Sequence, residues 1–206
     1  MAAAQTGTGK TAGFALPIIN ALMPSASHSA SPARHPVRAL IIAPTRELAD
    51  QIHDNVKTYI QFTPLRSAAL LGGADLAPHR ARAALGGVDV QPQTNALRAG
   101  VEILIATPGR LLDHVQQKSV NLSQVQLLVL DEADRMLDMG FSEDVFRIAE
   151  MLPTERQTVC FTATVSHDVR NLADKLLKDP QWLTVERSEE ALTPIDDHVV
   201  YVDNPG

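Results

Sequence analysis

A glycine-rich segment near the start of the chain has the composition of a phosphate-binding loop. Residues 4–11 read Ala-Gln-Thr-Gly-Thr-Gly-Lys-Thr, and a helical pattern begins where they end. Glycines let backbone N–H groups turn inward around phosphate oxygens, and a helix N-terminus attracts anions. Lys10 would reach the β- and γ-phosphates, and the Thr11 hydroxyl would ligate magnesium. The candidate nucleotide-binding residues are Gln5, Thr6, Gly7, Thr8, Gly9, Lys10 and Thr11.

That loop departs from the usual pattern, because Ala4 stands where the first glycine is expected. A plain glycine turn before a helix is therefore an alternative. A second group of residues weighs against it. Residues 127–134 read Leu-Leu-Val-Leu-Asp-Glu-Ala-Asp, so an apolar strand would deliver acids at its carboxyl end.

The two acids that follow this apolar run suit the chemistry of phosphoryl transfer. Asp131 would hold Mg²⁺ through water, opposite Thr11, and Glu132 would orient or deprotonate the water that attacks the γ-phosphate. The alternative is a solvated acidic turn that caps the next helix. This alternative is less favoured because the glycine loop lies in the same chain. The candidate catalytic residues are Lys10, Asp131 and Glu132.

Short apolar, β-branched runs alternate along the chain with amphipathic stretches. Strands are predicted at Val37–Ala43, Val101–Ala106, Val125–Leu130 and Thr158–Thr162. Helices are predicted at Lys10–Leu22, Glu47–Ile60, Arg110–Gln117, Ser142–Leu152 and His167–Lys178. Continuously apolar strands are buried on both faces, so this alternation predicts an α/β fold with a parallel sheet between two helical layers. Ligands bind at the carboxyl ends of the strands in such sheets.

Composition restricts the class of protein. The 206 residues fit one domain, and the single cysteine, Cys160, excludes an internal disulfide. No apolar stretch has the length of a membrane span, and the first residues lack the order of a signal peptide, so a cytoplasmic protein is predicted. The formal net charge of −6 does not indicate a nucleic-acid binder, although a local basic groove is compatible with it. The histidines, among them His28, His35 and His53, are interpreted as surface residues.

Further motifs follow the predicted strands in a characteristic order. They are Pro44–Leu48, Thr107–Arg110 and Thr162–Thr164, in addition to the glycine loop and the Asp-Glu-Ala-Asp segment. Together they resemble the first RecA-like lobe of the DEAD-box ATP-dependent RNA helicases, although that family more often has Ser-Ala-Thr at 162–164. The segments 111–116 and 136–141 resemble the bacterial RhlE-type subgroup. The resemblance implies a P-loop NTPase lobe that uses ATP and Mg²⁺ and couples hydrolysis to remodelling of RNA duplexes.

The resemblance also assigns residues that grip the RNA backbone without regard to base sequence. These are Pro44, Thr45, Arg46, Thr107, Pro108, Gly109 and Arg110. N–H groups, hydroxyls and arginines at strand-to-helix junctions suit phosphate oxygens. The alternative, favoured for either motif alone, is that Thr45 and Thr107 cap helices and Arg46 pairs with a surface acid.

A glycine pair and a pair of threonines complete the implied site. Residues 68–92 contain a short duplication with two such pairs, and Gly86-Gly87 is preferred over Gly72-Gly73 because the residues after it resemble the family more. The resemblance implies that the hydroxyls of Thr162 and Thr164 bond Asp134 and couple the ATP state to the grip on RNA. Edge threonines of a strand are the alternative.

Departures from the family are equally informative. Residues 1–187 are predicted to form an incomplete first lobe, with 24–36 as a surface loop or flexible insertion, and 188–206 as a linker and the start of a missing second lobe. The strand before the glycine loop and the adenine-reading segment are expected to be missing. The chain alone is therefore expected to show weak or no ATPase. The alternative function is a non-catalytic truncated fragment with at most weak RNA or nucleotide binding.

Overall fold

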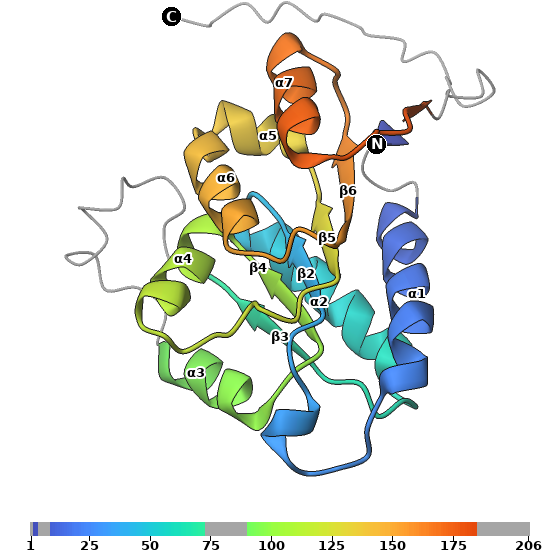
Figure 1. Cartoon of the computed structure of the whole chain (residues 1–206), viewed down its shortest axis with the longest axis vertical. Coiled ribbons are helices and arrows are strands. Elements are labelled where there is room, and N and C mark those ends of the chain that lie inside the picture. Colours follow the sequence, from blue (N-terminus) through green and yellow to red (C-terminus); the bar gives the residue numbers. More distant parts are fainter. Residues whose placement is uncertain (1, 4–8, 73–89, 185–206) are drawn as a thin grey trace, which may run out of the picture.

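The chain folds around a parallel β-sheet flanked by helices (Figure 1). This computed structural model describes residues 2–3, 9–72 and 90–184. In that part of the chain the strand order is β3-β4-β2-β5-β6-β1-β7, and every neighbouring pair is parallel. The strands are β1 (Ala2–Ala3), β2 (Ala39–Ile42), β3 (Ser67–Leu70), β4 (Ile103–Ala106), β5 (Leu127–Leu130), β6 (Gln157–Thr162) and β7 (Leu183–Thr184). The predicted α/β class is confirmed.

The expectation that the strand before the glycine loop is missing is wrong. Ala2 and Ala3 form β1, which pairs with Phe161 and Thr162 of β6 on one side and with β7 on the other. Ladder hydrogen bonds use backbone groups alone, so even two alanines complete the row between their neighbours. The glycine loop therefore follows a strand, as a phosphate-binding loop should.

Helices cover both faces of the sheet, and the central strands are therefore buried on both faces. They are α1 (Lys10–Leu22), α2 (Arg46–Ile60), α3 (Val90–Ala99), α4 (Pro108–Gln116), α5 (Ala133–Asp138), α6 (Ser142–Glu150) and α7 (His167–Leu176). Alternate strand residues face opposite ways: Ile41 packs in a core with α1 and α2, and Leu40 in a core with α4, α6 and α7. Figure 1 shows α1 on one side of the sheet and α4 and α6 on the other.

The predicted elements are present, with ends shifted by a few residues, and α1 has the predicted bounds. Local capping explains two starts. Thr45 accepts a hydrogen bond from the Leu48 N–H at the start of α2, and Ser166 accepts one from the Val169 N–H at the start of α7. The elements β3, α3 and α5 were not predicted from the sequence. The alanines of β3 give a weak strand signal, and α5 spans only six residues.

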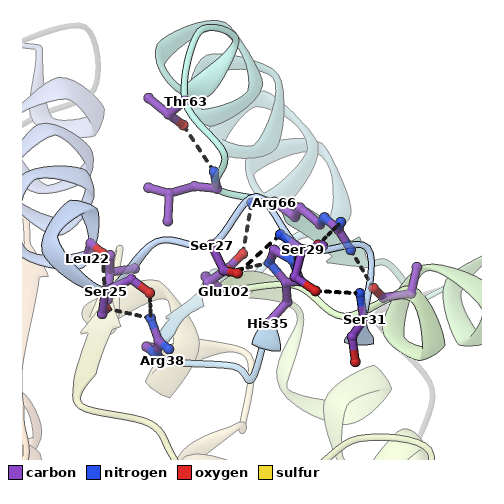
Figure 2. Close-up of polar contacts among 12 residues, drawn as sticks. Leu22, Ser25, Ser27, Ser29, Ser31, His35, Arg38, Thr63, Arg66 and Glu102 are labelled. Atoms are coloured by element: carbon purple, nitrogen blue, oxygen red, sulfur yellow. Dashed lines mark hydrogen bonds and ion pairs between the residues drawn. The ribbon is translucent and has the colours of Figure 1, made fainter. Parts of the chain in front are cut away.

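The segment predicted as a surface loop or flexible insertion, residues 24–36, is anchored by polar contacts (Figure 2). His35, interpreted from the sequence as a surface residue, is buried, and its Nδ1 lies 2.5 Å from Glu102 Oε1. Its Nε2 lies 2.7 Å from the Ser29 carbonyl oxygen, which also accepts from Arg66. The loop contains two short 3₁₀ turns, η1 (Met23–Ser25) and η2 (Pro32–Arg34). These hydrogen bonds of the buried His35 and Glu102 side chains explain why a polar, proline-rich sequence packs here.

Gly100, which ends α3, cannot be replaced without strain. Its φ is +81°, and a Cβ at this position would lie 2.8 Å from both the Pro32 carbonyl oxygen and the His35 Cβ. We expect Gly100→Ala to lower the free energy of unfolding by roughly 2–4 kcal/mol, which combines the left-handed backbone with the overpacked contact. Urea unfolding measures this loss.

Gly140→Ala is the matched control for that substitution. Gly140 has a φ of +78°, but no atom of the described residues lies within 4 Å of the position of its Cβ. It should lose only about 1–2 kcal/mol, the part due to the backbone. Equal losses in the two variants would show that the loop does not press against Gly100.

Two remaining features agree with the composition. Cys160 is buried in β6, and burial raises the pKa of its thiol to about 12, so it is an inert core residue. None of the helices in the described part of the chain combines the length and apolar character that crossing a bilayer requires.

Candidate nucleotide site and the neighbouring strand ends

The carboxyl edge of the sheet gathers the motif residues in a fixed order. Backbone hydrogen bonds link the residues that follow adjacent strands: Asp131 N–H donates to Ile42, Ala43 N–H to Ala106, and Thr107 N–H to Leu70. From the strand order, the segments after β3, β4 and β2 occupy one half of this edge, and those after β5, β6 and β1 the other. The sheet thus separates the candidate RNA residues from the candidate nucleotide residues.

Lys10 and Asp131 meet at the nucleotide half of the edge. Lys10 Nζ lies 3.4 Å from Asp131 Oδ1, and the two side chains are only 9 % and 2 % exposed. Burial raises the pKa of Asp131, Lys10 opposes that rise, and Glu132 adds to it. The same Oδ1 accepts the Glu132 N–H at 3.0 Å. Because burial disfavours the ionised form of Asp131, additional positive charge, such as a bound divalent cation, would stabilise its carboxylate.

The start of α1 beside this pair is suited to an anion. Gly9, the N-cap, adopts a left-handed conformation with φ 76° and has no side chain that could accept from the first-turn N–H groups. Thr11 is the second residue of the helix and is half-buried. Gln5, Thr6, Gly7 and Thr8 lie outside the described residues.

Glu132 stands immediately after Asp131 in a strained conformation. Its φ of 52° and ψ of 53° are left-handed, which residues other than glycine adopt rarely and often at functional sites. Its Oε2 lies 3.4 Å from Nη1 of Arg135, one helical turn further on. Arg135 was not predicted as a site residue, although a glutamate and an arginine three residues apart at a helix start are a signal that the sequence contains.

Asp134 connects the acidic segment to the residues after β6. Its Oδ2 accepts hydrogen bonds from the Thr164 hydroxyl at 2.8 Å, the Thr164 N–H at 2.9 Å and the Ala163 N–H at 3.2 Å. Burial alone would raise the pKa of Asp134, but these bonds and the Arg135 N–H together lower it. The predicted contact with Thr164 is present. The predicted contact with Thr162 is wrong, because that hydroxyl donates to the Thr164 carbonyl.

The candidate RNA residues lie at the other half of the edge. Thr45 caps α2 through its hydroxyl, as the alternative interpretation held. The Thr107 hydroxyl caps nothing and is buried, with no hydrogen-bond partner among the described residues. Arg46 is exposed, Pro44, Pro108 and Gly109 are buried, and Arg110 is buried with its Nε 4.0 Å from Asp113. Gly72 lies two residues after the end of β3, whereas Gly73, Gly86 and Gly87 lie outside the described residues.

Comparison with known proteins agrees with this geometry. A family model described as "DEAD/DEAH box helicase" matches residues 1–172. The chain belongs to the DEAD/DEAH box helicase family. Among its relatives in that family, RNA helicase CrhR of Synechocystis sp. is 37 % identical over 202 residues, covering 98 % of this chain and 36 % of the relative. DEAD-box ATP-dependent RNA helicase RhpA of Helicobacter pylori is 40 % identical over 195 residues, 95 % of this chain and 35 % of the relative.

Structural comparison places this DEAD/DEAH box chain beside a solved family member. A DEAD box protein from the hyperthermophile Methanococcus jannaschii matches with a TM-score of 0.74 and 34 % identity, covering 90 % of this chain and 44 % of that one. The chain spans about a third of the length of several curated relatives that it matches. Their names, which include CrhR, DeaD, CshA and RhlB, do not single out the RhlE-like subgroup.

Proposed function

We propose that this chain is the ATP-binding and ATP-hydrolysing lobe of an ATP-dependent RNA helicase. The observation that carries the proposal is the contact between Lys10 Nζ and Asp131 Oδ1, two residues 121 positions apart. It joins the end of the glycine loop to the acids after β5 at the edge where α/β folds bind ligands. A salt bridge with only a structural role would not explain why the left-handed Glu132 and the start of α1, whose N-cap Gly9 offers no side chain, lie at the same place.

The donor set at this edge fits MgATP. The N–H groups at the start of α1 and the Lys10 ammonium suit phosphate oxygens, while the Thr11 hydroxyl would ligate Mg²⁺ directly and the buried Asp131 carboxylate would hold it through water. Bound Mg²⁺ would neutralise charge on the phosphates during transfer. Lys10 would exchange its contact with Asp131 for the β- and γ-phosphates.

Glu132 is the residue that we assign to the attacking water. Its carboxylate follows Asp131 directly and is 13 % exposed, so it can reach a water molecule beside the γ-phosphate without being fully solvated. A carboxylate in this position accepts a proton or orients the nucleophile. Asp134 and Thr164 would transmit the state of this site to the strand ends after β6, a role that their hydrogen bonds support.

The other half of the edge is the proposed RNA surface. Thr107, Arg110, Thr45, Arg46 and the glycine pair follow neighbouring strands, so they would track one backbone without reading bases. The Thr107 hydroxyl is buried and has no hydrogen-bond partner in the described part of the chain, which supports a ligand there. Gly72 lies two residues after Leu70, whose carbonyl accepts the Thr107 N–H, and the pair Gly86-Gly87 remains the preferred one on sequence grounds.

Three finer assignments accompany this function. The RhlE-like subgroup rests on the segments 111–116 and 136–141. A second RecA-like lobe as partner, which would complete the ATP site, is supported by the longer relatives that this chain matches in part. A reducing, cytoplasmic location is supported by the single buried cysteine.

Nucleotide and RNA measurements on the same protein test the proposal. We expect a fluorescent ATP analogue to bind in the presence of Mg²⁺, and a malachite-green assay to detect slow phosphate release above a Lys10→Ala control. Single-stranded RNAs of unrelated sequence should bind equally, with an affinity that falls as salt rises. A chain that binds neither MgATP nor RNA would instead be the non-catalytic fragment.

A further inference from the structure

The carboxylate of Glu132 is held by one neighbouring side chain. Arg135 Nη1 lies 3.4 Å from Glu132 Oε2, and among the described residues this is the only hydrogen bond or ion pair of that carboxylate. The glutamate is 13 % exposed and the arginine 56 %. The contact therefore joins the mostly buried carboxylate of Glu132 to the exposed guanidinium of Arg135.

The backbone conformation around Glu132 places its side chain beside that of Arg135. Glu132 is the N-cap of α5 and is left-handed, so its main chain is fixed by the turn from β5 into the helix. Residues three apart at a helix start lie on the same face, which brings the guanidinium to the carboxylate. The Arg135 N–H donates to Asp134 Oδ1 at 3.0 Å, and the other oxygen of Asp134 binds Thr164. Arg135 thus contacts both the proposed base and the proposed coupling acid.

We propose that Arg135 is a positioning residue for ATP hydrolysis, which holds Oε2 of Glu132 and leaves Oε1 to accept a proton from the attacking water. This inference rests on the proposed function. A base is effective only when its free oxygen lies within hydrogen-bond reach of the water in a defined orientation. A glutamate with several rotatable bonds has that orientation only if another group holds it, and Arg135 is the group that does so here.

A purely structural role of Arg135 would predict a lower melting temperature when the ion pair is lost. Ion pairs at the surface between residues three apart stabilise a protein little, so we expect the melting temperature to stay unchanged. Arg135 also makes no contact with Lys10 or Asp131 in the structure. Its loss should therefore affect the hydrolytic step and not the binding of nucleotide.

Substitution of Arg135 with glutamine and with lysine tests the proposal on the full chain. We expect Arg135→Gln to lower kcat about fivefold, the size of one exposed charge contact, with KM for ATP unchanged. Arg135→Lys should restore most of the rate, because its ammonium reaches the same carboxylate. Arg147→Gln, at an exposed arginine near the end of α6, is the matched control and should hydrolyse like wild type. An unchanged kcat in Arg135→Gln, or a change confined to KM, would overturn the proposal.

A carboxyl ¹³C measurement makes the test independent of turnover. The Glu132 side-chain resonance, assigned by its disappearance in Glu132→Gln, should move in Arg135→Gln and return in Arg135→Lys. A resonance that stays in place overturns the positioning role even if hydrolysis is robust. If wild type releases no more phosphate than Lys10→Ala, the proposed function fails by itself, and the resonance still decides whether Arg135 holds Glu132.

Discussion

Lys10→Ala is expected to weaken the binding of MgATP by roughly 30- to 1000-fold, the effect of removing one partner of a buried charge pair. Lys10 is the cation beside Asp131, and both side chains are almost fully buried. Its loss removes the charge that would meet the phosphates and leaves the Asp131 carboxylate without a partner cation. Titration of a fluorescent ATP analogue in the presence of Mg²⁺ measures the change.

Lys57→Ala provides the control for that experiment. Lys57 lies in the last turn of α2, is 54 % exposed and pairs with Asp54, so it tests the loss of a lysine away from the strand ends. It should bind MgATP as wild type does. The assignment of the nucleotide site fails if Lys10→Ala retains wild-type affinity while its melting curve shows an intact fold.

His35→Ala is expected to lower the free energy of unfolding by about 2–4 kcal/mol, because it leaves a buried carboxyl oxygen of Glu102 without its hydrogen-bond partner and opens a cavity. Neither side chain of the His35–Glu102 pair is exposed. The second oxygen of Glu102 accepts the Arg66 N–H at 2.9 Å, which does not replace the lost contact. A loss of this size is a large part of the stability of an ordinary domain. Urea unfolding followed by circular dichroism measures it.

Two further variants isolate the contribution of the pair. His28→Ala removes an exposed histidine from the same loop and should be nearly neutral. The double variant His35→Ala with Glu102→Ala should be less destabilised than the sum of the single variants, since neither member of the pair is left buried without the other. Additive losses would mean that the two groups are not coupled as the structure shows.

Local patterns predicted the central elements of the fold well. The apolar runs that became β2, β4, β5 and β6 are continuous in sequence because those strands lie mostly inside the molecule, and α1 begins at Lys10 as the glycine loop predicts. Short or alanine-rich elements were missed, since β1 and β3 owe their place to ladder bonds with neighbouring strands. Their own side chains indicate a strand only weakly.

The candidate site was predictable to the extent that its chemistry is written in residue types. A lysine and a threonine after glycines, and acids after an apolar strand, identify Lys10, Thr11, Asp131 and Glu132 from the sequence alone. The structure then corrected details that depend on side-chain direction. Thr164 bonds Asp134 and Thr162 does not, although both hydroxyls are available in the sequence.

The sequence by itself determined the alternation of strands and helices, the phosphate-binding chemistry and the family that these motifs resemble. Only the tertiary structure decided the strand order β3-β4-β2-β5-β6-β1-β7, which puts nucleotide residues at one half of the edge and RNA candidates at the other. It also decided that His35 is buried against Glu102 and that Arg135 reaches Glu132. The physical reason is that a uniformly apolar run predicts a buried strand but does not predict which other strands lie next to it in the sheet. Neighbours are chosen by how the connecting helices pack across the sheet, a property of contacts between residues far apart in the chain.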